Sequence, residues 1–174
     1  AETFGGYETG NFTSSSKGND TWAVTDLKNS SKASVQIRAE ENGNQYLYMS
    51  KEGSGELSVY NKNGMNLSGV VTIEARVMRT ADSASANQFG MYTYNKSNFT
   101  SGTPSKSSSP IATFALSKGN IITHNKKDSS STVNLQKYEL GTWDIIRNVV
   151  NLDTNTFDIY INDMNEPVLS NQPL

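Results

Sequence analysis

The 174-residue sequence predicts an all-β fold, an antiparallel two-sheet β-sandwich or jelly roll, in a single domain over residues 1–174. Three observations support this prediction. Apolar and polar residues alternate with a period of two in about a dozen short segments, as in strands with one buried face. Turn residues separate these segments at intervals of roughly 8 to 12 residues. No window shows a sustained apolar period of 3.6 residues, so little or no helix is expected.

In the N-terminal part, short alternating segments stand on either side of one strong turn. Asn42-Gly43 is a typical two-residue hairpin turn, so the flanking segments Ala33–Glu40 and Gln45–Met49 are expected to pair. Each alternates apolar and polar residues. A short strand at Thr3–Phe4 and a second at Thr21–Thr25 are expected before this hairpin. One further strand, at residues 56–60, is expected after it.

The middle of the chain contains the most regular alternation. Val70–Met78 places small and branched apolar residues on one face and Thr, Glu and Arg on the other. Gln88–Tyr94 continues the pattern after a loop. Ile111–Leu116 and Asn120–His124 form a hairpin through a Lys-Gly turn, between two polar loops. Val133–Tyr138 is the last strand before the C-terminal hairpin.

That C-terminal hairpin is the clearest element of all. Its strands are predicted at Trp143–Leu152 and Phe157–Asn162. The residues between them form a turn, because Asp and Asn hydrogen-bond their own backbone and tolerate the left-handed region. The alternation of side chains between the two faces of each strand, here called strand phase, then predicts which residues form the core. The expected core side chains are Ile73, Val77, Phe89, Met91, Ile146, Val150, Phe157 and Ile159.

Composition restricts the classes of function. The net charge is −2 and the pI about 5.4, so the chain has no electrostatic signature for nucleic acid or an anionic membrane. No apolar run reaches the ~18 residues that a membrane span needs. The absence of cysteine excludes a disulfide framework, a thiolate zinc site and a cysteine nucleophile. A chain that opens on Ala-Glu-Thr fits the mature form of a secreted, extracellular protein.

Several segments together resemble the concanavalin A-like jelly rolls of the LamG type. They are an opening Glu-Thr-Phe, Asn44–Met49 after a turn glycine, Val71–Arg76, and Gly141-Thr-Trp143 followed by the C-terminal hairpin. The nearest relatives by this resemblance are carbohydrate-binding modules attached to bacterial levanases and pectate lyases. The resemblance implies a non-catalytic module that targets a tethered enzyme to a polysaccharide, either plant cell-wall pectin or a fructan. It also implies a role in plant cell-wall degradation.

The same resemblance raises two further expectations. Such domains close with a strand near the N-terminal strand. Here that strand is either missing, supplied by another polypeptide, or formed around Val168-Leu169. Such domains also often carry a structural calcium, which takes six to eight oxygen ligands. The candidate calcium ligands are Glu2, Asp20, Asp26 and Asn44.

Polar and aromatic side chains opposite the apolar faces form the candidate sugar site. Aromatic faces pack on sugar C–H groups, and charged or amide groups bind the hydroxyls. The candidates are Tyr48, Glu74, Arg76, Tyr92, Tyr94, His124, Arg147 and Tyr160. Strand phase suggests that Arg76, Tyr92, Tyr94 and Arg147 share one open sheet face. The two arginines favour an acidic glycan, since guanidinium pairs with carboxylate in a bidentate fashion.

Catalytic templates of related jelly rolls are not matched. The laminarinase run Glu-x-Asp-x-x-Glu is missing, and so are the Gln-x-His and Tyr-x-Lys-x-Gly-x-Tyr strands of alginate lyases. Two alternatives to a binding module stay open. One is a small lyase or glycosidase that uses Glu74 or Asp158 with His124, the single histidine of the chain. The other is an adhesin or matrix-interaction domain.

Overall fold

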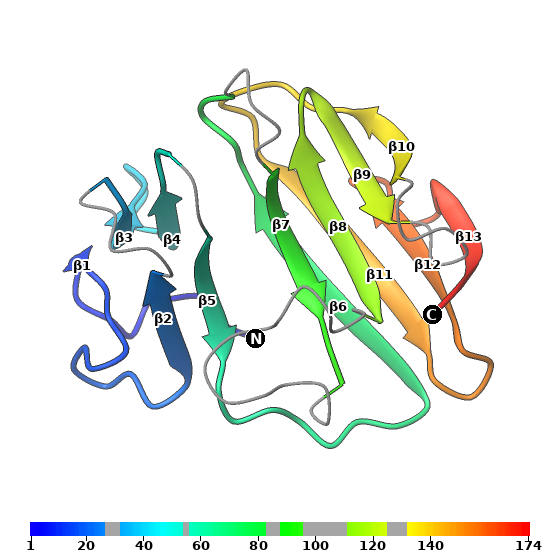
Figure 1. The fold of residues 1–174 in the computed structure, drawn as a ribbon, viewed down its shortest axis with the longest axis horizontal. Coiled ribbons are helices and arrows are strands. Elements are labelled where there is room, and N and C mark those ends of the chain that lie inside the picture. Colours follow the sequence, from blue (N-terminus) through cyan, green and yellow to red (C-terminus); the bar gives the residue numbers. More distant parts are fainter. Residues whose placement is uncertain (27–31, 54–55, 83–87, 96–110, 125–131) are drawn as a thin grey trace. The chain divides into compact units, whose positions relative to one another are not determined.

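The computed structural model describes residues 1–26, 32–53, 56–82, 88–95, 111–124 and 132–174, and every regular element among them is a β-strand. The prediction of an all-β fold is therefore confirmed (Figure 1). The strands are β1 Gly10–Asn11, β2 Trp22–Asp26, β3 Ser34–Ala39, β4 Gln45–Ser50, β5 Leu57–Asn61, β6 Val70–Val77 and β7 Gln88–Thr93. They continue with β8 Ala112–Ser117, β9 Asn120–His124, β10 Thr132–Lys137, β11 Asp144–Asn151, β12 Thr156–Ile161 and β13 Leu169–Pro173. None of the described residues forms a helix long and apolar enough to cross a membrane.

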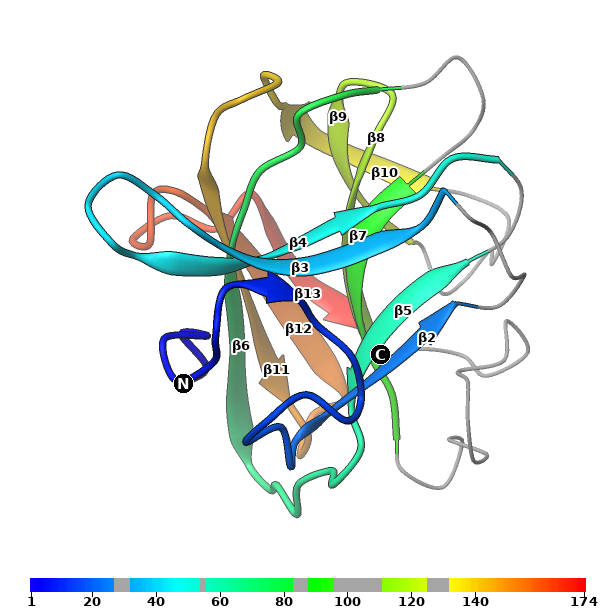
Figure 2. The same cartoon turned by 90° about the vertical axis from the view of Figure 1, so that its left-hand side faces the viewer.

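The described residues divide into two compact units, one up to Met65 and one from Asn66 onwards. A single domain over residues 1–174 stays a prediction. In the first unit β1, β3 and β4 form one antiparallel sheet, and β2 pairs with β5 (Figure 2). Its core is formed by Phe12, Val35 and Ile37, because the alternation of β3 turns the last two to the same side.

The second unit contains two antiparallel sheets, compatible with a β-sandwich. One has the strand order β10-β9-β8-β7 and the other β13-β12-β11-β6. The apolar faces of the two sheets meet in one core, in which Phe114 and Leu116 of the first sheet pack with Ile146, Phe157 and Ile159 of the second. We call the first sheet the β7–β10 sheet and the second the β6/β11–β13 sheet.

The predicted C-terminal hairpin is present. β11 and β12 pair from Ile146 opposite Ile161 to Asn151 opposite Thr156. Asn155 in the turn has a φ of 55°, in the left-handed region that Asn tolerates. Burial alternates along β11, so Arg147 lies on the outer face, as the sequence predicted. β13 continues this sheet beyond β12. A strand is therefore present at Leu169, near the expected Val168-Leu169, but its partner is β12, and pairing near an N-terminal strand stays a prediction.

Two expectations are wrong. Thr3–Phe4 is a turn, in which Phe4 has a φ of 57° and its carbonyl accepts the Tyr7 N–H; the first strand is β1 instead. Met91 is 38% exposed although it is in phase with the core. It lies on β7, the last strand of its sheet, where a side chain has fewer neighbours. The other expected core residues are buried or pack partly buried against the core.

Candidate functional site

The candidate sugar-binding residues of the second unit lie on two different sheets, on the faces that point away from the core between the sheets. Arg76 and Arg147 project from the outer face of the β6/β11–β13 sheet, whereas Tyr92 projects from the outer face of the β7–β10 sheet. The expectation that Arg76, Tyr92, Tyr94 and Arg147 share one face is therefore wrong. All four are out of phase with the core, but the core lies between them. Tyr48 belongs to β4 of the first unit.

Aromatic and polar side chains gather on the outer face of the β7–β10 sheet. The rings of Tyr92 and Tyr94 lie 6.5 Å apart at 26°, and the ring of His124 lies 6.0 Å from that of Tyr92. Thr113 stands opposite Tyr92 in the register, and its Oγ1 is 3.1 Å from His124 Nδ1. Tyr92 is 38% exposed. We call these four residues the tyrosine–histidine cluster; they come from β7, β8, β9 and the residue after β7.

Gly90 makes the position of Tyr92 possible. It precedes Tyr92 on the same face of β7 and pairs with Ala115 of β8. A Cβ at Gly90 would lie 2.8 Å from Ala115 Cβ, 2.8 Å from the Phe114 carbonyl oxygen and 3.1 Å from Tyr92 Cε2. The Tyr92 ring thus lies across a strand position at which no side chain fits.

Gly90→Ala is expected to destabilise the protein by about 1–3 kcal/mol, because β7 must move away from β8 to accommodate the methyl group. The same shift displaces the Tyr92 ring. Thermal unfolding measures the loss, and the aromatic NMR signals of Tyr92 report the displacement. Gly6→Ala is the control, because a Cβ there meets no atom within 4 Å. Equal melting temperatures for the two variants would contradict the contact.

Burial lowers the pKa of His124 below its ordinary value of 6.5, so the imidazole is neutral at pH 7. The unfolded state therefore binds more protons than the folded state between the two pKa values. Stability is expected to fall as the pH drops through and below about 6.5, and to be fully present above it. Unfolding free energies of the parent and His124→Gln between about pH 5 and 7.5 test this. Parallel pH profiles would show that His124 does not contribute the slope.

The cluster contains two phenol rings and a neutral imidazole, and the Thr113 hydroxyl beside the imidazole is buried. The hypothesis that His124 forms an acid/base pair with Glu74 or Asp158 is wrong, because both carboxylates lie on the outer face of the other sheet. General acid/base catalysis needs its groups within hydrogen-bond reach of one substrate.

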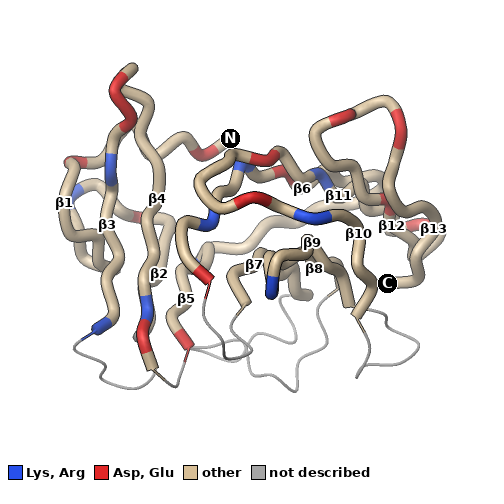
Figure 3. Tube along the Cα trace, turned by 90° about the horizontal axis from the view of Figure 1, so that it is seen from above, with Lys and Arg blue, Asp and Glu red and all other residues tan. Residues whose placement is uncertain are grey.

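The arginines of the β6/β11–β13 sheet are engaged with neighbours. Arg147 Nε lies 2.6 Å from Glu74 Oε2, and the two residues stand opposite each other in the β6–β11 register. The Arg76 guanidinium lies 4.0 Å from the centre of the Trp143 ring. Tyr160 stands beside Arg147 on β12. Acidic and basic residues are interspersed along the described chain (Figure 3), and the Arg147–Glu74 pair is an example.

The candidate calcium ligands lie in the first unit. Both Glu2 carboxylate oxygens accept hydrogen bonds: Oε2 from the Thr3 and Phe4 N–H groups, and Oε1 from the Tyr7 hydroxyl and Trp22 Nε1, the last at 2.7 Å. Burial works to raise the pKa of Glu2, but these hydrogen bonds outweigh it, so the pKa lies below its ordinary value.

Groups of two other candidates form hydrogen bonds within the protein. The Asn44 side chain donates to Glu40 Oε2 at 2.8 Å, and the Asp20 carbonyl accepts from Asn63. The side chain of Asp26 lies outside the described part of the structure. Among the described residues, no group of three or more His, Asp or Glu side chains is placed to hold a metal. Calcium binding stays a prediction.

Sequence reasoning missed Arg38. Its guanidinium lies 3.4 Å from the centre of the Tyr48 ring, and its Nε donates to Gln36 Oε1 at 2.9 Å. The three residues share the outer face of the β3–β4 hairpin, since Gln36 pairs with Tyr48 and Arg38 pairs with Tyr46. The Asn-Gly turn could have given this register. The Tyr48 ring therefore packs against the Arg38 guanidinium.

Comparisons with protein families, with curated proteins and with solved structures find no match to this chain. The resemblance to concanavalin A-like modules stays an expectation based on the segments quoted above.

Proposed function

We propose that the protein is a non-catalytic carbohydrate-binding module whose glycan lies on the tyrosine–histidine cluster. The observation that carries this proposal is the pair of tyrosine rings, 6.5 Å apart and close to parallel, on an outer sheet face. Two such rings offer apolar faces to the C–H groups of a sugar. The His124 imidazole lies beside them, next to the buried Thr113 hydroxyl, and can hydrogen-bond a sugar hydroxyl.

Three neighbouring strands hold Tyr92, Thr113 and His124 of the cluster in place. Side chains on strands are held by the sheet and lose little conformational freedom when a ligand arrives. Tyr92 is 38% exposed, whereas Thr113 and Ala115 on the same sheet face are buried, so a glycan contacts this face at the exposed ring. On this proposal the module is secreted and directs a tethered catalytic domain to a plant cell-wall pectin or a fructan.

Tyr92→Ala is expected to weaken glycan binding roughly 10- to 100-fold, because it removes one of the two rings and leaves the sheet intact. Affinity electrophoresis in gels containing levan, arabinan or polygalacturonate measures the change. Tyr46→Ala, on the outer face of β4 in the first unit, is the matched control. Melting curves confirm that both variants fold.

Unchanged retardation of Tyr92→Ala on every polysaccharide that the parent binds would place the glycan elsewhere. Parent protein that binds none of them would overturn the proposal. Binding to a matrix protein instead would favour the adhesin alternative.

A further inference from the structure

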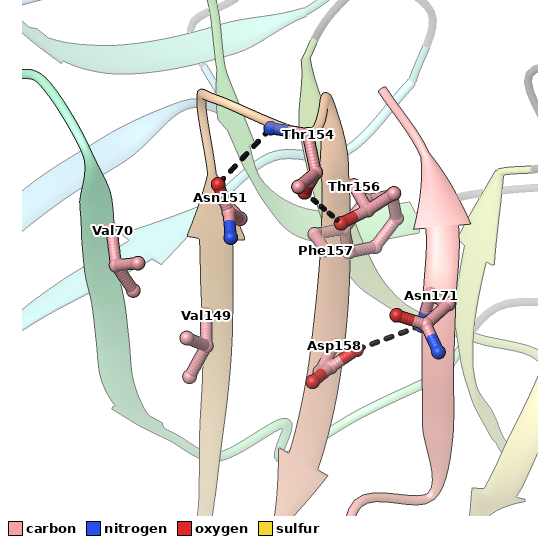
Figure 4. A pocket seen from close by; sticks show the side chains of 8 residues that line it. All are labelled: Val70, Val149, Asn151, Thr154, Thr156, Phe157, Asp158 and Asn171. Carbon is pink, nitrogen blue, oxygen red and sulfur yellow. Dashed lines mark hydrogen bonds between the residues drawn. The ribbon is translucent and has the colours of Figure 1, made fainter.

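A depression of about 360 Å³ lies on the outer face of the β6/β11–β13 sheet, at the turn of the C-terminal hairpin (Figure 4). This volume falls within the range of roughly 300–1,000 Å³ usual for small-molecule sites. The depression and the tyrosine–histidine cluster lie on opposite outer faces of the second unit. Its lining residues are Val70, Val149, Asn151, Thr154, Thr156, Phe157, Asp158 and Asn171.

Polar groups at its edge are held in place by the backbone. Asn151 Oδ1 accepts the N–H groups of Asp153 and Thr154 at 3.0 and 3.1 Å, so its Nδ2 points away from the turn (Figure 4). Asp158 Oδ1 accepts the Asn171 N–H at 2.7 Å. Among the described residues, none donates a hydrogen bond to the second Asp158 oxygen, and none is hydrogen-bonded to the Asn171 side-chain amide.

Asn171 reaches this position through a local irregularity. The β12–β13 register shifts between Phe157 and Ile159, and Asn171 has a φ of 53°. A positive φ is uncommon outside glycine, and asparagine is among the residues that tolerate it. The result is an amide and a carboxylate facing solvent side by side, with the Asn151 amide across the depression (Figure 4).

The apolar part and the charge define the ligand. Val70, 62% exposed, and Val149 form an aliphatic side wall suited to sugar C–H groups. Asp158 is the one ionisable residue among those that line the depression, and it is a carboxylate. It accepts hydrogen bonds from hydroxyl groups, whereas it repels a carboxylate or sulfate. An acidic glycan is therefore disfavoured.

We infer that this depression is a second binding site, for a neutral saccharide unit, and the inference rests on the proposed glycan-binding function. The wall of the depression is aliphatic, whereas the tyrosine–histidine cluster is aromatic. Because aromatic rings offer larger faces to sugar C–H groups, the depression is the site of lower affinity. One module then holds two glycan segments on opposite faces, which raises its avidity for a dense polysaccharide.

The test is an NMR titration of the parent with neutral fructo-oligosaccharides and arabino-oligosaccharides, and with trigalacturonate as the acidic probe. The side-chain amide signals of Asn151 and Asn171 are expected to move with a neutral probe and to stay fixed with trigalacturonate. Asp158→Asn, which keeps an oxygen for the Asn171 N–H, is expected to weaken this response about 10-fold or more. Asp153→Asn, in the same turn but outside the lining, is the charge-matched control and should respond like the parent.

In Tyr92→Ala the Asn151 and Asn171 shifts are expected to persist. If a neutral probe moves the Tyr92 signals while both amides stay fixed, the second site is refuted and the proposed function stands. If trigalacturonate moves the amides, the assignment to a neutral saccharide is refuted. If no probe moves either set of signals, both the proposed function and the second site fall.

Discussion

Phe157→Ala is expected to lower the free energy of unfolding by about 3–5 kcal/mol. Phe157 is 2% exposed and lies on β12, between β11 and β13 in its sheet. Its ring packs in the core formed by the two sheets of the second unit. Truncation removes the buried ring and leaves a cavity, because the strands on both sides are hydrogen-bonded and cannot collapse into the space.

Urea denaturation followed by tryptophan fluorescence measures this loss. Tyr160→Ala, on the same strand but the outer face, is the matched control and should cost less than half as much. A loss below about 1 kcal/mol for Phe157→Ala would show that the ring is not buried between the sheets.

Asn19→Ala is expected to cost about 2–4 kcal/mol, because buried backbone groups lose their partners. Asn19 is 6% exposed and organises the segment before β2. Its Nδ2 donates to the Thr13 and Trp22 carbonyls at 2.9 and 2.8 Å, and its Oδ1 accepts the Thr21 and Trp22 N–H groups at 3.3 and 2.8 Å.

Thermal unfolding monitored by near-UV circular dichroism, which reports the Trp22 environment, measures this cost. Asn63→Ala is the control, because the exposed Asn63 side chain makes one hydrogen bond with the described residues, to the Asp20 carbonyl, and its loss should cost below about 1 kcal/mol. Similar losses for the two variants would mean that Asn19 does not hold this segment.

Strands were predictable because alternation is a local signal. Asn120–His124 has the expected bounds, β6 differs from the expected bounds by one residue at one end, and β11 and β12 differ by one residue at each end. The N-terminal segment is the exception. Phe4 sits in a turn fixed by the Glu2 carboxylate and packs its ring 6.0 Å from that of Trp22. A turn held by a carboxylate and a contact between residues as far apart as Phe4 and Trp22 leave no period of two in the sequence.

The candidate site was predictable only in part, for a physical reason. Strand phase separates inner from outer side chains but is identical in both sheets, so it could not tell that Arg147 and Tyr92 lie on opposite faces. Nor could it identify the Glu74 partner of Arg147, which lies 73 residues away in sequence. Asn148 shows the converse: it is polar, but strand phase places it in the core, and it is 1% exposed.

Each sheet of the second unit has one edge strand with an irregular register, β10 in one and β13 in the other. At one edge the β9–β10 register shifts between Asn134 and Gln136, and at another the β12–β13 register shifts as well. β13 also ends on Pro173, which has no N–H to donate. A bulged or proline-terminated edge is a poor template for a strand of another molecule. These two edges therefore oppose edge-to-edge aggregation, a property that the proposed binding at a polysaccharide surface would require.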